Sequence, residues 1–215
     1  MSARRKSAKS KKTEIGSRKA KSNRSRTEAT RGALLEAARH LFAEKGFADT
    51  GTPEIVAAAG VTRGALYHHF IDKLELFRCV IEGEASRVAE EIARETFEVA
   101  SPLDGMLRGA DAYFRAMSRP GRARLLLLEG PAVLGVAEMD EIDRRTGRSE
   151  LREGLVLALG DRQDDRTIDA LAAVLSAAFD KAALAIASGE PAEEYKDALR
   201  MLATGIPGMT SEIHS

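Results

Sequence analysis

Residues 50–73, TGTPEIVAAAGVTRGALYHHFIDK, carry the start and stop signals of two short helices joined by a tight turn. Thr52 can cap the first helix, and Pro53 suits its first turn because the N–H that proline lacks would have no partner there. Gly60 fits the left-handed conformation that ends a helix, and Thr62 can cap the second one. The stretch therefore predicts a helix–turn–helix.

The second helix, residues 63 to about 69, has one apolar face and one nearly smooth face. Leu66 and Phe70 lie on the same side of the helix and are expected to pack inward. The other sides carry Arg63, Gly64, Ala65, Tyr67, His68 and His69. Small residues let the backbone come close to a partner, while Arg and Tyr side chains can bond guanine or phosphate. This helix end suits the major groove of DNA.

The run IVAAAGVTRGALYHHFIDK at residues 55–73, preceded by LFAEKGF at 41–47, closely resembles the DNA-binding head of the TetR/AcrR family of bacterial transcriptional regulators. The resemblance covers residues 27–77 and does not extend into the rest of the chain. Gly51 and Pro53 stand where members often carry longer polar residues. The resemblance implies a homodimer whose head binds double-stranded operator DNA and whose body varies with its small-molecule effector.

Two kinds of DNA contact are expected, and the resemblance supports the division position by position. Arg63 and Ala65 are predicted to face base edges. Gly64 permits the close approach, and His68 could contact bases or phosphates. The predicted phosphate contacts are Thr52, Thr62, Tyr67, His69 and Lys73. Lys73 opens the next predicted helix, and a helix N-terminus favours an anion.

Positive charge is concentrated at the start of the chain. The 215 residues carry no net charge, but residues 1–26 hold eleven Lys or Arg and one acid, a net charge of +10. Such a segment, rich in Ser and poor in apolar side chains, cannot bury enough surface to fold. We predict a disordered basic arm over residues 1–25. An auxiliary contact with DNA phosphates is favoured over a solvated tail without a role.

Composition and motifs argue against catalysis and against a membrane protein. The single cysteine, Cys79, excludes an intramolecular disulfide and suits a reducing compartment. No apolar run approaches the roughly 20 residues that cross a bilayer, so the chain is predicted to be soluble and cytoplasmic. The motifs GxSxG and HExxH are missing. His68 and His69 point about 100° apart on a helix and cannot share a metal. No enzyme activity, cofactor or metal is expected.

The rest of the chain shows helical periodicity interrupted by Pro and Gly, without a strand pattern, and predicts an all-α fold of about nine helices. A supporting helix from Ser25 to Gly46 precedes the reading pair, and Asp72 with Glu75 forms the capping box of a long helix to about Val99. Further helices are expected over residues 102–118, 122–129, 132–159 and 164–188, with a break at Gly130–Pro131 and a possible interruption at Gly147; a last helix is expected between Pro191 and Gly205.

These elements divide the chain into four segments. They are the basic arm at residues 1–25, a helix–turn–helix DNA-binding domain at 26–71, a helical effector-binding and dimerisation domain at 72–205, and a flexible tail at 206–215. The long helix that begins at residue 73 would connect the two domains. A tilt of this helix at one end would therefore move the other end as well.

A ligand pocket is predicted inside the helical body. Apolar side chains at helical spacing could line it, although each could equally belong to a filled core. These are Phe114, Met117, Leu125, Leu128 and Leu134. An effector bound between the helices at 73–99, 103–118 and 132–159 would move the long helix. Glu129, beside the expected break, could anchor a cation of the ligand or simply be solvated.

The last two predicted helices can form an internal hairpin or half of a four-helix dimer interface. DNA reading favours the dimer, because one short helix gives limited specificity and two-fold dimers read two half-sites. The predicted interface comprises Leu171, Leu175, Phe179, Ala182, Ile186, Tyr195, Leu199 and Leu202.

The predicted function is that of a sequence-specific, homodimeric transcriptional regulator, with repression favoured over activation, which a small and apolar effector releases from operator DNA. One alternative is an architectural DNA-binding dimer that needs no effector and in which the basic arm dominates. Another is a helical ligand-carrying protein or enzyme with a vestigial head. DNA affinity that is independent of sequence would favour the architectural dimer. Failure to bind promoter DNA would favour the ligand-carrying protein or enzyme.

Overall fold

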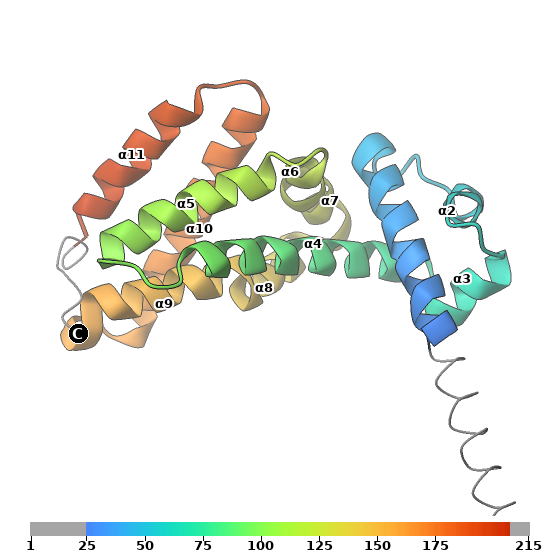
Figure 1. Ribbon diagram of the computed structural model, residues 1–215, viewed down its shortest axis with the longest axis horizontal. Coiled ribbons are helices and arrows are strands. Elements are labelled where there is room, and N and C mark those ends of the chain that lie inside the picture. Colours follow the sequence, from blue (N-terminus) through green and yellow to red (C-terminus); the bar gives the residue numbers. More distant parts are fainter. Residues whose placement is uncertain (1–24, 207–215) are drawn as a thin grey trace, which may run out of the picture.

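The computed structural model describes residues 25–206, and within this range it contains helices and no strand. The predicted all-α fold is confirmed. A small head lies at one end of the long helix α4 (Lys73–Glu95), and the remaining helices surround the other end (Figure 1). Except for residues 25 and 206, the predicted basic arm and tail lie outside the described residues.

The head consists of a first helix over residues 25–45, α2 (Thr52–Ala58) and α3 (Arg63–His69). Its core contains the side chains that helical spacing places inward: Leu34, Ala38, Phe42, Ile55, Leu66 and Phe70. Phe77 of α4 packs edge-on against Phe42, with 5.1 Å between the ring centroids. The head and the start of α4 therefore share one core.

The predicted turn between α2 and α3 is confirmed. Gly60 has a φ of +65°, and Thr62 Oγ1 accepts a hydrogen bond of 3.2 Å from the amide of Ala65. The predicted cap at Thr52 is wrong, because Gly51 precedes the helix without a side-chain cap and Thr52 is the first helical residue. The adjoining proline then takes the second position, where its missing N–H still costs little.

α4 begins as predicted and ends earlier. Asp72 Oδ1 accepts a hydrogen bond of 2.7 Å from the amide of Glu75 and caps the helix. At the other end, the Thr96 hydroxyl bonds at 3.1 Å to a carbonyl one turn earlier, and the last helical residue is Glu95 instead of Val99. Such a side chain competes with the backbone for its hydrogen bonds. The 23 residues of α4 span about 35 Å.

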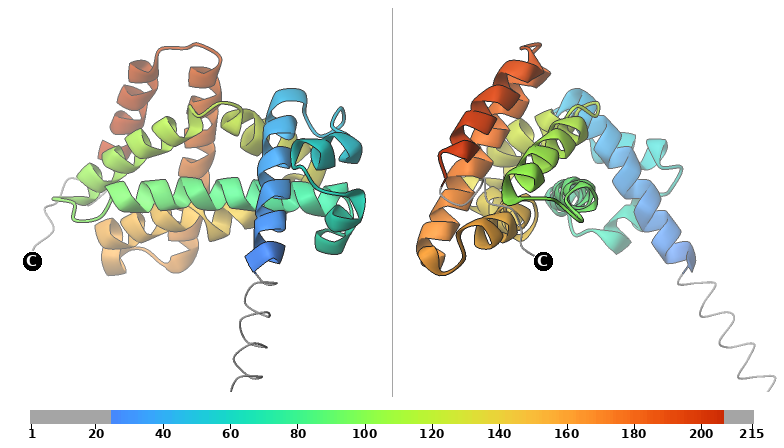
Figure 2. Two further views of the ribbon diagram at one scale, coloured as in Figure 1. Left: turned by 45° about the vertical axis from the view of Figure 1, so that its right-hand side comes forward. Right: turned by 60° about the vertical axis from the view of Figure 1, so that its left-hand side comes forward.

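The helices of the body pack around α4 as an inner pair and an outer pair. Its long helices are α5 (Pro102–Met117), α9 (Gly147–Leu159), α10 (Asp165–Ala187) and α11 (Ala192–Thr204). α5 and α9 contact α4 directly, while α10 packs on α9 and α11 packs on α5. α10 and α11 form an antiparallel hairpin at the outside of the body (Figure 2).

α10 corrects one expectation about apolar segments. By length and composition alone this helix is apolar enough to cross a membrane, with a mean hydropathy of 1.7 in its most apolar window. In the structure α10 packs against α5, α9 and α11. A core helix of a helical body can have the same composition.

Residues 122–134 form one continuous but irregular helical segment. It comprises α6 (Arg122–Arg124), a π-helical turn (Leu125–Glu129) and α7 (Gly130–Leu134). The amide of Gly130 bonds to the carbonyl of Leu125. This wider turn lets Pro131 take an early position in α7, where its missing N–H costs little. The predicted break at Gly130–Pro131 is therefore wrong.

The predicted helix over residues 132–159 is divided in two places. Gly135, with a φ of +88°, separates α7 from α8 (Val136–Arg145). Thr146 separates α8 from α9, directly before Gly147, the expected interruption. A 3-10 turn (Gly160–Arg162) then leads towards α10.

A buried ionic cluster joins the head to the body at Glu84 of α4. The fully buried Glu84 carboxylate lies 3.0 Å from Arg39 of the first helix and 2.8 Å from Arg122 of α6. Arg122 is also buried and donates to the carbonyl of Ala116 at 3.0 Å. Burial alone would raise the pKa of Glu84, but the hydrogen bonds from Arg39 and Arg122 outweigh it and lower the pKa. The carboxylate is therefore charged.

A half-buried polar contact connects α5 to α10. The hydroxyl of Tyr113 donates a hydrogen bond of 2.5 Å to Asp180 Oδ1. Burial raises the pKa of Asp180 to about 6; the hydrogen bond from Tyr113 opposes this shift, and the Asp143 carboxylate adds to it. Burial, followed by Asp180, raises the pKa of Tyr113 well above its ordinary value. Tyr113 is thus the hydrogen donor of the pair.

Glu84→Gln should destabilise the protein, because the buried Arg122 would lose the nearer of its two carboxylate partners, Glu84 at 2.8 Å, and keep only Glu91 at 3.2 Å. We expect the free energy of unfolding to fall by about 3–5 kcal/mol, measured by urea denaturation at neutral pH. Glu90→Gln, at an exposed position of the same helix, is the control and should change it by less than about 0.5 kcal/mol. Equal unfolding free energies for the wild type and Glu84→Gln would show that the cluster does not stabilise the fold.

The raised pKa of Asp180 predicts a pH-dependent stability. The folded state holds this proton up to about pH 6, whereas the unfolded chain releases it near its ordinary pKa of 3.8. The contribution of this carboxyl to the unfolding free energy therefore declines as the pH rises through this range.

Asp180→Asn keeps a hydrogen-bond acceptor for Tyr113 and cannot ionise, so it tests this decline directly. Its stability relative to the wild type should increase by roughly 2 kcal/mol between about pH 4.5 and about pH 7, measured by chemical denaturation. A difference that does not vary with pH would contradict a half-buried, ionising carboxyl.

Candidate nucleic-acid interface and ligand cavity

The predicted reading strip on α3 faces outward. Arg63 and Gly64 are exposed and Tyr67 exposes 44% of its surface, whereas Leu66 is fully buried. A side chain added at Gly64 would meet nothing closer than Thr62 Oγ1, at 3.9 Å. The first turn of α3 can therefore come close to another molecule.

Three of the predicted DNA contacts come together where α3 passes α2. The guanidinium carbon of Arg63 lies 5.5 Å from the centre of the Tyr67 ring. Hydrogen bonding with Arg63, and then with Thr52, lowers the pKa of the Tyr67 phenol. The three side chains thus present hydroxyl groups and a positive charge side by side. This combination can bind phosphates and guanine.

His68 and His69 differ in their surroundings. Their ring centroids lie 5.3 Å apart, and His69 packs beside Phe70. Burial lowers the pKa of His69, and the neighbouring His68 and Arg31 add to the effect. His69 is therefore neutral at neutral pH and can donate a hydrogen bond without adding charge. Within residues 25–206, no three potential metal ligands of the His, Cys, Asp and Glu types lie together.

Lys73 ties the start of α4 to the loop that precedes α2. Its Nζ donates hydrogen bonds of 2.8 Å to the carbonyl of Phe47 and 3.0 Å to that of Thr50. It also lies 4.1 Å from the centre of the Phe47 ring. Two of the three ammonium N–H groups are thus engaged inside the head. The predicted phosphate contact of Lys73 depends on the third.

The head meets the body at a second place besides α4, where residues 43–47 contact residues 121–129; we call this place the neck. Arg124 donates to the carbonyl of Glu44 at 2.9 Å and to Glu129 Oε1 at 3.1 Å. Glu129 Oε2 accepts a hydrogen bond of 2.9 Å from the amide of Phe47. The π-helical turn and the end of the first helix are therefore joined by directional bonds.

Glycines make the close approach at the neck possible. A Cβ added at Gly121, which has a φ of +75°, would lie 2.4 Å from the Cβ of Ala43. A Cβ added at Gly46 would lie 2.6 Å from Glu129 Oε1. Glu129 is thus neither a ligand anchor nor a solvated residue, because both of its oxygens are used at the neck. No local pattern in the sequence indicates this contact, since Glu129 and Phe47 are 82 residues apart.

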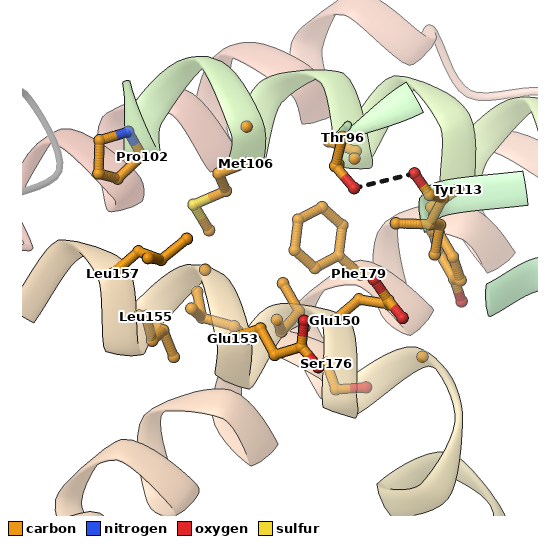
Figure 3. A pocket seen from close by; sticks show the side chains of 18 of the residues that line it. Thr96, Pro102, Met106, Tyr113, Glu150, Glu153, Leu155, Leu157, Ser176 and Phe179 are labelled. Atoms are coloured by element: carbon orange, nitrogen blue, oxygen red, sulfur yellow. Dashed lines mark hydrogen bonds between the residues drawn. The ribbon is translucent and has the colours of Figure 1, made fainter. Parts of the chain in front are cut away.

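A cavity that is partly open to solvent lies in the body between α4, α5, α9 and α10 (Figure 3). It contains about 1020 Å³ of space that no atom fills, part of it open to solvent. Much of its wall is apolar and includes Ile92, Met106, Leu151, Leu155, Leu175 and Phe179. Its polar part includes Thr96, Tyr113, Asp143, Glu150, Glu153, Ser176 and Asp180.

The predicted pocket residues lie elsewhere. Four of them line neither this cavity nor the one next to it: Phe114, Leu125, Leu128 and Leu134. Met117 lines the neighbouring cavity, beside α8, which shares Tyr113 and Asp180 with the first. Helical spacing identifies inward-facing side chains, but the packing of helices decides which of them border unfilled space.

The predicted dimer interface is only partly outward. Four of its residues are buried within the protomer: Leu175, Phe179, Ala182 and Leu199. The prediction is wrong for these four, since they form the inward face of the hairpin. Leu171, Ile186 and Tyr195 are half-buried. The large apolar side chains exposed on this hairpin are Val174, Met201 and Leu202.

Two known sequence families match the chain. Residues 34–80 match the family described as "Bacterial regulatory proteins, tetR family", and residues 103–208 match "Tetracyclin repressor-like, C-terminal domain". The first match covers most of the head and the start of α4. The second begins in α5 and covers most of the body.

Individual proteins match in the same regions. The HTH-type transcriptional repressor BepR of Brucella suis is 44% identical over 84 residues, which are 37% of this chain and 40% of BepR. The repressor Rv1474c of Mycobacterium tuberculosis is 27% identical over 187 residues, which are 83% of this chain and 93% of that protein. The chain spans between 33% and 44% of the length of the first curated relatives that it matches.

The likeness extends to the three-dimensional structure. The crystal structure of a TetR-family transcriptional regulator from Pectobacterium atrosepticum is similar with a TM-score of 0.69 and 29% identity, covering 88% of this chain and 99% of that one. The expectation of a regulator instead of an enzyme agrees with these relatives. With its helix–turn–helix head, its helical body and a family match to each, the chain belongs to the TetR family of transcriptional regulators.

Proposed function

We propose that two copies of the chain form a repressor that binds a two-fold operator through α3 and leaves it when a small molecule occupies the cavity between α4, α5, α9 and α10. The exposed strip of α3, with Thr52, Arg63 and Tyr67 brought together, carries the DNA-binding part of this proposal. The names of the related BepR and Rv1474c as repressors support repression over activation.

In the proposed complex, the first turn of α3 enters the major groove. Arg63 and Ala65 face base edges there, and Gly64 lets the backbone approach. The Thr62 hydroxyl accepts a hydrogen bond from the Ala65 amide and can still donate its own proton to a phosphate. The Tyr67 hydroxyl can do the same. Residues 27–80 hold six Lys or Arg and seven acids, so the attraction to DNA depends on where charges stand and not on bulk charge.

The outer face of α10 and α11 is the proposed dimer surface. Val174 exposes 68% of its surface and Met201 exposes 76%, and exposed apolar patches mark interaction sites. Ala170 and Ala177 lie on the same face of α10 as Val174 and are also exposed. Their small side chains allow close helix packing, so two hairpins can form a four-helix bundle.

A ligand in the cavity would touch the helices that carry the head. Ile92 of α4, Thr96 directly after this helix and Met106 of α5 line the cavity, and the head rests on α4 and on the neck. A ligand that fits one arrangement of these helices better favours the matching head position. The spacing of the two reading helices then changes, and with it the affinity for a two-fold operator.

Selection of bound sequences from a random DNA pool tests the DNA-binding part. The wild type should enrich a palindrome, and Arg63→Ala should lose about 1–3 kcal/mol of binding free energy concentrated at one position of each half-site. Arg94→Ala, exposed at the far end of α4, is the control and should select the same sequence as the wild type.

Other outcomes separate the alternatives. An equal loss of Arg63→Ala on all sequences would make Arg63 a phosphate contact. Affinity without any enriched sequence would favour the architectural DNA-binding dimer, in which the basic arm of residues 1–25 dominates. No binding at low salt would overturn the proposed function.

Arg124→Ala tests whether the neck positions the head. Loss of its bonds to Glu44 and Glu129 should accelerate amide hydrogen exchange at residues 43–47 and change the DNA affinity by about 0.5–2 kcal/mol without changing the preferred sequence. Arg115→Ala, a partly exposed ion-pair partner of Glu95 on the body, is the matched control. Unchanged exchange and unchanged affinity would remove the neck from the mechanism.

A further inference from the structure

The cavity between α4, α5, α9 and α10 is acidic. Its wall contains four carboxyl groups, those of Asp143, Glu150, Glu153 and Asp180. Among the described residues, no Lys, Arg or His lines it. Arg148, which lies outside this wall, pairs with Asp143 at 2.9 Å and balances one of the four charges. The other three carboxyl groups have no ion pair with any described residue.

Glu150 and Glu153 stand one turn apart on α9. Figure 3 shows both side chains beside the cavity, on the side where Phe179 and Ser176 also lie. Glu150 is half-buried and has neither a hydrogen bond nor an ion pair among the described residues, and Glu153 is exposed at the rim. Burial raises the pKa of Glu150, and Glu153 adds to the effect. The cavity thus holds negative charge without a protein counter-ion.

The remaining wall suits the apolar body of a ligand and the charge of a cation. The rings of Tyr113 and Phe179 lie nearly edge to face, with 5.9 Å between their centroids, and aromatic ring faces attract cations. Met106 and Leu151 add apolar surface. Leu157 lies exposed at the rim near Glu153 on the same helix, so the rim also combines apolar and acidic groups.

Ligand charge decides which molecule this wall accepts. An anion would meet carboxylates and no base, which disfavours its binding. A neutral molecule would seal Glu150 away from water without a partner, and an unpaired buried charge is costly. A cation would supply the missing partner and gain contact with the aromatic rings.

We propose that the ligand of this cavity is a lipophilic cation, an amine or quaternary ammonium with an apolar body, whose charge lies against Glu150 and Glu153. This inference rests on the proposed function in so far as it takes the cavity as the effector site. It replaces the expectation of a purely apolar effector.

A matched series of three probes with one apolar body isolates the effect of charge. The probes are (4-phenylbutyl)trimethylammonium, 4-phenylbutan-1-ol and 4-phenylbutanoate, titrated calorimetrically into the full chain near neutral pH. The cation should bind about tenfold more tightly than the alcohol, and the carboxylate more weakly than both. Equal or tighter binding of the alcohol, or no binding of the cation, would overturn the proposal.

Single substitutions test whether Glu150 and Glu153 are the groups that bind the charge of the cation. Glu150→Gln should lower the affinity for the cation about tenfold and leave that for the alcohol unchanged. Glu153→Gln should also weaken only the binding of the cation, by a smaller factor. Because Glu153 is exposed at the rim, this variant tests the proposal with less disturbance of folding than Glu150→Gln. Glu194→Gln, an exposed position on α11, should change neither affinity. A cation-to-alcohol ratio that both cavity variants leave unchanged would overturn the assignment to these carboxylates.

The outcome is separable from that of the proposed function. DNA binding by the same preparation is measured with and without the cation. Selective binding of the cation without any effect on DNA affinity would support this inference and contradict effector release. Sequence-specific DNA binding without cation binding would contradict this inference alone.

Discussion

The carboxylate of Glu84 holds the head and the body together. A buried carboxylate needs charged partners that replace its lost water, and these arrive from two sides: Arg39 from the first helix and Arg122 from α6. Because both arginines must reach the same carboxylate, the first helix, α4 and α6 can pack in few relative positions. The position of the reading helix on the body follows from this requirement, since α3 shares its core with the first helix and α4.

The neck adds a second set of directional contacts next to this cluster. Arg124 and Glu129 form hydrogen bonds with backbone groups of residues 44 and 47. A movement of the π-helical turn would therefore displace the head, as a movement of α4 would. Directional hydrogen bonds tolerate small displacements poorly, and packed interfaces change between discrete arrangements instead of deforming smoothly. A ligand between α4, α5 and α9 would therefore act on the head through contacts that respond to small movements.

The two polar regions of the body differ in how their charges are matched. Glu84 has arginine partners on the first helix and on α6, whereas Glu150 faces the cavity without one. The first arrangement stabilises one geometry of the protein. The second leaves electrostatic energy that a ligand can recover. The same side-chain type thus stabilises the structure at the neck end of the body, and in the proposed effector site it would contact the ligand.

Local signals were sufficient where one turn of chain decides the structure. Gly60, Thr62 and Asp72 act on backbone groups within a few residues, and the helix–turn–helix followed from them. Local reasoning failed at Thr52, where the cap moved by one residue, and at Pro131, where a wider turn absorbed the proline. In both places an alternative backbone geometry satisfied the same residues at low cost.

The helix–turn–helix head and the all-helical body follow from the order of residues, because caps, turns and helical periodicity are short-range properties. The family was indicated by the resemblance of residues 41–47 and 55–73 to known members. The cavity, the inward face of the hairpin, the neck and the pairing of Glu84 became visible only in the folded chain. Periodicity tells which side of a helix is inward, yet which inward side chains meet and which leave space depends on contacts between residues far apart in the sequence. Glu129 and Phe47, 82 residues apart, show why such contacts escape any reading of neighbouring residues.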